Sequence, residues 1–274
     1  MRLAVSVLAL LLVTAACNKN PYTGRLQLDL IPDSQEQKMG VQAYTQLMQD
    51  PKVQISHDPA EVNAVQRVAQ RIIAAAKNSK YSKTANEFQW EVTVIKDDKT
   101  MNAFALPGGK IAVYTGIFPV AKTEAGLAAV LGHEVTHALA RHGAERMSQG
   151  VFAQAAVVGA TLGAASQGIS PQLAQLAGGA LANYGFILPY SRKHESEADH
   201  IGIIFMADAG YDPHEAIHLW ERMEPFSKGQ PPEFLSTHPS HGKRIAQIEQ
   251  WMPEAMSHYH PDPALRNADL PALH

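Results

Sequence analysis

Apolar residues recur at helical spacing in two stretches near the start of the chain. Ser34-Gln35-Glu36-Gln37 has the form of a capping box and predicts a helix that runs to about Gln49. Asp58-Pro59 predicts the start of a second helix, because proline fits the first helical position. The apolar side of this second helix consists of Val62, Val65, Val68, Ala69 and Ile72.

Strands are predicted next. Residues Phe88 to Ile95 alternate between apolar and polar side chains, which indicates a half-buried strand. Asn102 to Leu106 and Lys110 to Tyr114 flank the turn Pro107-Gly108-Gly109, a pattern that predicts a hairpin. Two roles for this hairpin stay open: structural support, or an edge strand that pairs with an extended peptide.

A third helix is predicted after Thr123, which can cap its start. Its apolar stripe consists of Leu127, Val130, Leu131, Val135, Ala138 and Leu139. His133 and His137 are four residues apart on this helix, so they project from one face and can grip one zinc ion. Glu134 lies beside them, where it can accept a proton from a water molecule at the metal. The alternative is a buried helix that carries two histidines by chance, which would leave their polar atoms without evident partners.

A fourth, amphipathic helix follows Ser191 and stops near Gly210. Glu195 and Asp199 are four residues apart on it and share one face. Two histidines need a further protein ligand to hold zinc, and Glu195 can supply it. Asp199 can orient a ligating histidine by accepting its second ring proton. The alternative is an ordinary solvated charged face.

The chain begins like an exported protein. Arg2 and an apolar run from Leu3 to Val13 predict a signal peptide over residues 1–16, and the run is too short to span a bilayer. The small residues before Cys17 resemble a bacterial lipobox, which implies a lipid on Cys17 and membrane attachment through it. Asn18 favours the outer membrane, so the expected location is the bacterial periplasm. Ordinary cleavage that leaves a free thiol is the alternative.

Composition narrows the class of protein. The net charge is −3 and charged residues make up 18% of the chain, so nothing indicates a nucleic-acid partner. Cys17 is the only cysteine, which excludes an intramolecular disulfide and a Cys-rich zinc site. A Gly/Ala-rich stretch over residues 150–185 contains Gly159 and Gly163. We interpret this stretch as two packed helices in a hairpin, with membrane contact as the alternative.

Several motifs together resemble one family. H-E-V-T-H, E-S-E-A-D and T-H-P-S-H-G-K-R-I occur in this order, after S-Q-E-Q-K-M-G and N-A-F-A-L-P-G-G. The set resembles the zinc metalloendopeptidases that include CAAX prenyl protease 1 and HtpX (Ste-type, gluzincin), and within them the periplasmic lipid-anchored bacterial branch. The resemblance implies a mostly helical α+β fold, gluzincin-like, with a small hairpin or sheet beside the H-E-x-x-H helix.

The resemblance also implies an organisation of the chain. The signal peptide would be followed by a lipid-anchored tether over 17–32 and a metallopeptidase domain over 33–252. A short helix from Ile245 to Trp251 would close that domain, and a Pro-rich tail would cover 253–274.

The resemblance implies roles for individual residues. His133, His137 and Glu195 would bind one zinc ion, Glu134 would be the catalytic base, and Asp199 would support a ligating histidine. His238 would lie near the metal, where it could stabilise the oxyanion or occupy the open metal position at rest.

Three further residues take supporting roles by the same resemblance. Arg244 would order the loop after His238. Asn102 and Ala103 would offer backbone contacts to an aligned substrate.

Two functions are therefore expected from the sequence. The first is a zinc-dependent metalloendopeptidase that hydrolyses extended, unfolded or misassembled cell-envelope proteins. The second is a chaperone-like lipoprotein of outer-membrane assembly, a partner of its machinery, with a latched zinc site and little proteolysis. Prenylated substrates are not expected, because no spanning helix follows the signal segment.

Overall fold

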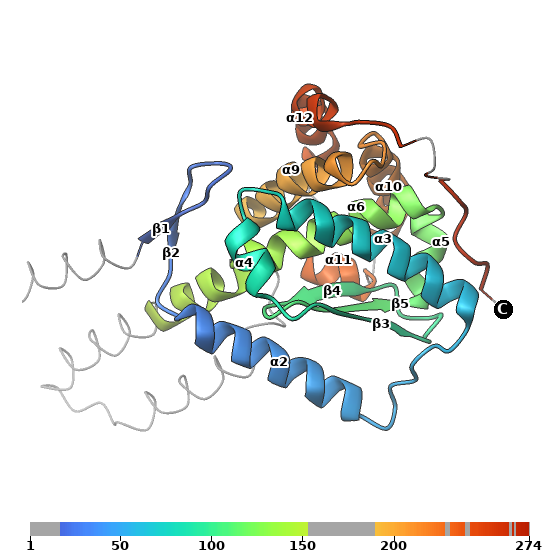
Figure 1. Ribbon diagram of the computed structural model, residues 1–274, viewed down its shortest axis with the longest axis horizontal. Coiled ribbons are helices and arrows are strands. Elements are labelled where there is room, and N and C mark those ends of the chain that lie inside the picture. Colours follow the sequence, from blue (N-terminus) through green and yellow to red (C-terminus); the bar gives the residue numbers. More distant parts are fainter. Residues whose placement is uncertain are drawn as a thin grey trace, which may run out of the picture. The chain divides into compact units, whose positions relative to one another are not determined.

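The computed structural model describes residues 17–152, 190–227, 231–238, 242–262, 265 and 267–273 (Figure 1). The predicted signal peptide over 1–16 lies outside these residues, as does nearly all of the predicted helical hairpin over 150–185. The chain divides into two compact units, one of residues 1–36 with 141–188 and the other of 37–140 with 189–274. We describe each unit by itself.

The second unit contains a three-stranded sheet with the order β3-β5-β4. Strand β3 (Glu91–Ile95) runs parallel to β5 (Lys110–Tyr114), and β4 (Ala103–Leu106) runs antiparallel to β5. The predicted hairpin is therefore confirmed. The predicted strand from Phe88 begins three residues later, because the Phe88 N–H bonds to the Thr84 carbonyl and ends a short helix.

Three long helices of this unit have side-chain caps at their starts, of which the cap at Thr123 was predicted. Asp58 caps α3 (Pro59–Lys77), Thr123 caps α6 (Glu124–Leu139) and Ser191 caps α9 (Arg192–Asp208), each by accepting a backbone N–H. Every residue of α6 is buried, because it packs against α3, α9 and strand β4 at once (Figure 1). The other helices are α2 (Asp33–Gln49), α4 (Ser82–Glu87), α5 (Phe118–Ala121), α10 (Glu215–Met223), α11 (Glu233–Thr237) and α12 (Arg244–His258).

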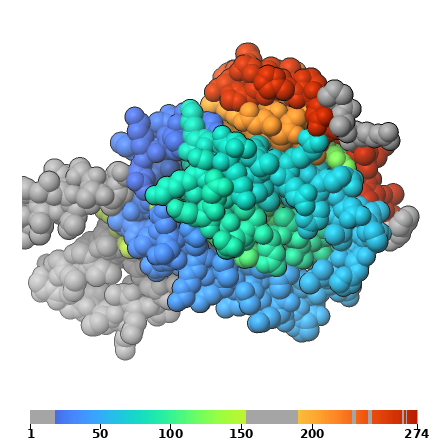
Figure 2. Space-filling model, in the orientation of Figure 1, coloured from blue at the N-terminus to red at the C-terminus, as the bar shows by residue number. Residues whose placement is uncertain are grey.

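Helix α12 differs from its prediction. The sequence predicted a helix only from Ile245 to Trp251, yet the helix continues through Pro253 to His258. An interior proline costs a helix about 3 kcal/mol. Burial of Ile248, Met252 and Ala255 offsets that cost, since α12 packs along α9 (Figure 2). The boundary expected at residue 253 thus falls inside a helix.

Part of the predicted C-terminal tail is attached to the start of α6. Asn267 accepts a hydrogen bond from the Ala125 N–H at 3.0 Å, and the Ala268 carbonyl accepts one from Glu124 at 2.9 Å. These contacts satisfy N–H groups that the first turn of a helix leaves without intrahelical partners. Within the described residues, no helix has the length and apolar run that crossing a bilayer requires.

The first unit begins with a small hairpin. Strand β1 (Cys17–Lys19) pairs antiparallel with β2 (Leu26–Leu28), and residues 142–152 are helical. Arg25 forms a double hydrogen bond with Glu145, at 2.7 Å for each contact. Part of the predicted tether is therefore folded.

Two glycines bring α6 and α9 into backbone contact beside the predicted metal ligands. A Cβ on Gly132 would lie 2.7 Å from the Gly202 carbonyl oxygen, and a Cβ on Gly202 would lie 2.9 Å from the His133 nitrogen. Neither position has space for a side chain. Close approach at this point fixes the distance between the His133 side of α6 and the acidic face of α9.

Substitution of Gly202 by alanine is expected to push the two helices apart. We expect a loss of about 1–3 kcal/mol in unfolding free energy, as for other overpacked cores, together with weaker zinc binding. Thermal denaturation and a chelator competition measure the two effects. Gly242→Ala is the matched control, because a Cβ there meets nothing within 4 Å. Unchanged zinc affinity in Gly202→Ala would show that this contact does not set the geometry.

Candidate metal centre

Helix α6 presents His133 and His137 on one face, as their spacing predicts. Their Nε2 atoms lie 3.0 Å apart, and both side chains are buried. The imidazole planes meet edge to face, with ring centroids 4.7 Å apart. Backbone geometry alone therefore points two ring nitrogens at the same place.

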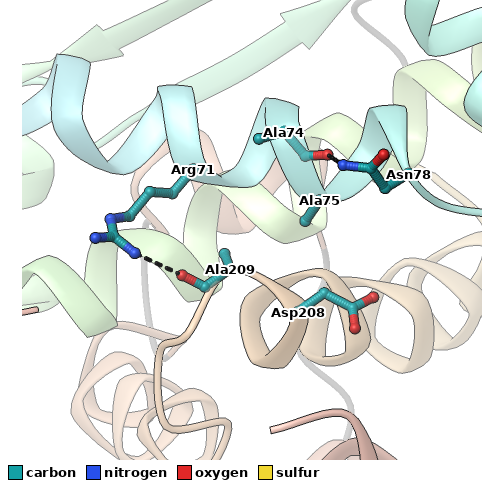
Figure 3. A pocket seen from close by; sticks show the side chains of 6 residues that line it. All are labelled: Arg71, Ala74, Ala75, Asn78, Asp208 and Ala209. Atoms are coloured by element: carbon teal, nitrogen blue, oxygen red, sulfur yellow. Dashed lines mark hydrogen bonds between the residues drawn. The ribbon is translucent and has the colours of Figure 1, made fainter. Parts of the chain in front are cut away.

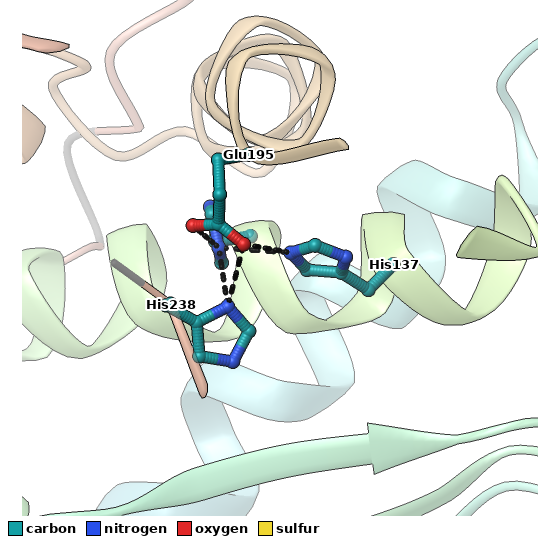
Figure 4. A group of neighbouring side chains, drawn as sticks. His137, Glu195 and His238 are labelled. Carbon is teal, nitrogen blue, oxygen red and sulfur yellow. Dashed lines mark hydrogen bonds and ion pairs between the residues drawn. The ribbon is translucent and has the colours of Figure 1, made fainter. Parts of the chain in front are cut away.

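Glu195 and His238 reach that place from two other elements (Figure 4). Glu195 extends from the first turn of α9, and its carboxylate oxygens lie 3.5 Å from His133 Nε2 and 3.4 Å from His137 Nε2. His238 follows α11, and its Nδ1 lies 3.1 Å from Glu195 and 3.2 Å from His133. One ligand atom from each of these four buried residues lies within 4.8 Å of the others.

The atoms that converge are suited to a cation. His133 Nδ1 lies 3.0 Å from the Asp199 carboxylate, which makes Nδ1 the protonated nitrogen and leaves a lone pair on Nε2. That lone pair faces two more ring nitrogens and the Glu195 carboxylate. Only a proton or a cation among them relieves the repulsion of so many acceptors. Imidazole and carboxylate in this number are a typical donor set for zinc.

Arg244 joins the carboxylates of the two acidic residues on α9. Its Nε and Nη2 donate to Asp199 at 2.6 and 2.7 Å, and its Nη1 lies 2.9 Å from Glu195 Oε2. The guanidinium is buried and begins helix α12. The predicted association of Arg244 with the site is thus seen as direct contact with Glu195 and Asp199.

The two glutamates of the site have pKa values shifted in opposite directions. Burial alone would raise the pKa of Glu195, but the neighbouring His238 and Arg244, with hydrogen bonds from His133 and His137, hold it well below the usual range. Burial raises the pKa of Glu134 to about 7. The Glu195 carboxylate is thereby kept anionic, whereas Glu134 can exchange a proton near neutral pH.

Glu134 lies between the cluster and the sheet. The backbone N–H of Ala105 in strand β4 is close enough to lower the pKa of Glu134, and Glu134 Oε1 lies 3.4 Å from His238 Nε2. Ala103 precedes Ala105 on the same edge, whereas the Asn102 carbonyl faces β5, and the Asn102 side chain accepts the Ala103 N–H at 2.9 Å. The predicted edge strand thus reaches the predicted base.

Three aromatic residues around the cluster were not predicted. Tyr190 stacks on His137 at 3.9 Å between centroids, Phe234 lies 4.8 Å from His238, and Trp220 lies 6.2 Å from His133. Of these three residues, only Phe234 had a signal in the sequence: it stands four residues, about one helical turn, before His238.

A hollow of about 320 Å³ lies apart from this centre, between α3 and the end of α9 (Figure 3). Arg71 at its rim donates to the Ala209 carbonyl and to Asp262. We assign no role to it. The residues that line it are Arg71, Ala74, Ala75, Asn78, Asp208 and Ala209.

The chain is similar to metalloendopeptidases of known name. It is 42% identical over 239 residues to mitochondrial metalloendopeptidase OMA1 of Schizosaccharomyces pombe, covering 86% of this chain and 66% of that protein. It is 32% identical over 247 residues to the human mitochondrial metalloendopeptidase OMA1, covering 86% and 46%. The beta-barrel assembly-enhancing protease of Yersinia pestis is 27% identical over 239 residues, covering 80% and 46%. The chain spans about half to two thirds of the length of these relatives.

These similarities correct one prediction. The expected location in the bacterial periplasm, attached to the outer membrane, is wrong, because the relatives of higher identity are mitochondrial and the bacterial ones are more distant. The likeness to the prenyl protease and HtpX branch is not confirmed at that level of detail. Lipid attachment at Cys17, where strand β1 begins, stays an untested prediction.

The predicted class of enzyme, a metalloprotease, is confirmed, and so are zinc as its metal and the mostly helical α+β fold. The model of peptidase family M48 matches residues 59–252, which include all four residues of the cluster, Glu134 and Arg244. The chain belongs to peptidase family M48.

Proposed function

We propose that this chain is a zinc-dependent endopeptidase that cleaves extended segments of unfolded or misassembled proteins. The observation that carries the proposal is the convergence of four buried metal-ligating side chains with Glu134 between them and an edge strand. Cleavage of an unfolded protein by the chain, and not by its Glu134→Gln variant, is the test.

Each residue of the site has a part in this proposal. His133, His137 and Glu195 would hold zinc, and Asp199 would keep His133 in the tautomer that binds it. Zinc, when bound, would polarise the substrate carbonyl and lower the pKa of water toward about 7. Glu134 would accept the proton of the attacking water and return it to the leaving amine. Its pKa of about 7 suits both transfers.

Strand β4 has an edge whose backbone groups could pair with an extended substrate. The Asn102 carbonyl accepts the Tyr114 N–H of β5, so by alternation Ala103 and Ala105 direct their backbone groups to the other edge. Among the described strands, β4 pairs only with β5. A peptide added along this edge would pass Glu134, because the backbone N–H of Ala105 is close enough to that residue to lower its pKa.

The substrate class is a finer proposal. The sequence suggested unfolded or misassembled proteins of the cell envelope; with the periplasmic location corrected, we keep unfolded or misassembled proteins as the class, and the name of the Yersinia pestis relative, which refers to β-barrel assembly, supports it. Assembly machinery of an outer membrane is the partner class that the same name supports. An extended edge strand accepts a substrate mainly through its backbone, which suits a broad set of unfolded chains.

A second candidate function rests on His238. Its Nδ1 lies within 3.2 Å of His133 and Glu195, where it would complete a set of four protein ligands. A zinc ion with four protein ligands has no open position for substrate or water. This arrangement supports an assembly factor whose zinc is latched at rest and whose proteolysis is minor.

Substitution of His238 by alanine is expected to distinguish the two roles of this residue. We expect the variant to keep zinc, because three ligands remain, and to cleave an unfolded protein severalfold faster, because the fourth position opens. Metal analysis and a digestion time course provide the measurements. A rate that falls about 10²–10³-fold would instead assign His238 to oxyanion stabilisation.

A further inference from the structure

Trp220 packs against Arg244, the residue that contacts Glu195 and Asp199 at the metal centre. It belongs to α10, and its side chain is 6% exposed. The Arg244 Cζ atom lies 3.4 Å from the centroid of the Trp220 ring. This distance places the guanidinium over the face of the indole, within the range at which a cation is attracted to the ring.

The Trp220 ring covers one face of the Arg244 guanidinium, and the two carboxylates lie at its edge. All N–H groups of a guanidinium lie in its plane, so hydrogen bonds leave from the edge. From that edge Arg244 donates hydrogen bonds to Asp199 at 2.6 and 2.7 Å, and its Nη1 forms an ion pair with Glu195 at 2.9 Å. The Trp220 ring takes the face and blocks tilting of the plane, which would break the bonds to one carboxylate or both.

These two carboxylates control the metal ligands. Glu195 is itself a member of the four-residue cluster, and Asp199 holds the His133 ring through Nδ1 at 3.0 Å. Arg244 therefore reaches Glu195 directly, and it reaches His133 both through Asp199 and through its own Nη2, 3.3 Å from His133 Nδ1. Whatever fixes the plane of Arg244 also fixes these ligands.

We infer that Trp220 is a positioning residue of the metal centre, which acts through Arg244 on Glu195 and Asp199. The inference rests on the proposed zinc site but not on peptide cleavage. Trp220 also lies 6.1 Å from Phe234 and 6.2 Å from His133, measured between ring centroids, as a core residue would. A role in packing alone would give the same burial, so the test must detect dependence on Arg244.

A double-mutant cycle detects that dependence. Zinc affinity is measured by chelator competition in the full chain, in Trp220→Met, in Arg244→Gln and in the double variant. We expect about tenfold weaker binding in Trp220→Met and about 10–100-fold weaker binding in Arg244→Gln, the usual range for partners of metal ligands. The double variant is expected to bind no more weakly than Arg244→Gln, because Trp220 has nothing left to position.

Trp251→Met is the matched control. Trp251 of α12 stacks on His200 of α9, with ring centroids 4.7 Å apart and 18° between the ring planes. Its substitution therefore removes an aromatic contact between α9 and α12 but leaves Trp220, and with it the contact to Arg244, in place. We expect this control to lose stability and to keep its zinc affinity. Equal losses of zinc affinity in Trp220→Met and Trp251→Met would indicate general loosening of the helices and would overturn the inference.

Two other results would overturn it as well. One is unchanged zinc affinity in folded Trp220→Met, and the other is a double variant whose loss equals the product of the single losses. If Trp220→Met does not fold, fluorinated tryptophan at position 220, in a Trp90→Phe, Trp251→Phe background, keeps the ring shape and weakens its attraction for a cation. Zinc affinity should then fall with each added fluorine, and constant affinity would reject the role. All these measurements remain valid if the chain proves not to cleave peptides.

Discussion

Glu134→Gln is expected to keep zinc and to lose about 10²–10⁴-fold in the rate of peptide cleavage, the usual contribution of a general base. Glutamine has nearly the same shape and can still approach His238 and Ala105. It cannot accept the proton of the attacking water. Glu134 is absent from the four-residue cluster, so the ligand set is unchanged by the substitution.

The measurement pairs metal analysis with digestion of an unfolded protein by both chains. Glu124→Gln is a suitable control, because Glu124 is a buried glutamate of the same helix that binds Arg67 instead. That control is expected to retain cleavage wherever it remains folded. Full activity of Glu134→Gln with zinc bound would remove Glu134 from the mechanism.

Glu195→Gln is expected to lose zinc, and cleavage with it. The neutral amide is a poor ligand, and among the residues that the structure describes it leaves the buried Arg244 with only Asp199 as an anionic partner. We expect zinc affinity to fall about 100-fold or more. Wild-type chain in free zinc at about 1,000 times Kd gains about 4 kcal/mol of stability. At about 2–4 °C per kcal/mol in a protein of this size, this gain raises the Tm by about 8–16 °C.

Thermal denaturation with and without a chelator measures this stabilisation. The wild-type Tm should fall on chelation and recover with added zinc, whereas the Tm of Glu195→Gln should respond to neither. Glu197→Gln on the same helix is the matched control, since Glu197 is buried on α9 but lies outside the cluster. A zinc-dependent Tm in Glu195→Gln equal to that of the wild type would exclude Glu195 as a ligand.

Local patterns in the sequence were sufficient to predict the main helices and the hairpin. Thr123 caps the helix that it was expected to cap, and helices begin after Asp58 and Ser191 as expected. The spacing of His133 and His137 also predicted their shared face, because four residues nearly complete one helical turn. These features depend on neighbours in the chain, which a single sequence displays.

Features that depend on distant segments were not predicted. Parallel pairing of β3 with β5 follows from tertiary packing and leaves no local signal. The contact between Gly132 and Gly202 joins residues seventy positions apart, and each glycine alone is unremarkable in a helix. Trp220 had no association with the site in the sequence, since only the fold brings α10 to Arg244.

One alternative from the sequence is excluded by burial. The acidic face of α9 could have been an ordinary solvated surface, but Glu195 is 1% exposed and Asp199 is 4% exposed. Both carboxylates instead contact His133 and Arg244. Carboxylates buried to this extent require compensating charge, which Arg244 supplies in part and a zinc ion would complete.

The most direct test of the account is the zinc content of the purified full chain, measured by elemental mass spectrometry beside Glu195→Gln. Whether three or all four of these side chains bind the metal, they would hold a single ion, because they meet at one place. The account predicts one zinc ion per wild-type chain and almost none in Glu195→Gln. A wild-type chain that contains no zinc after preparation in excess metal would contradict it.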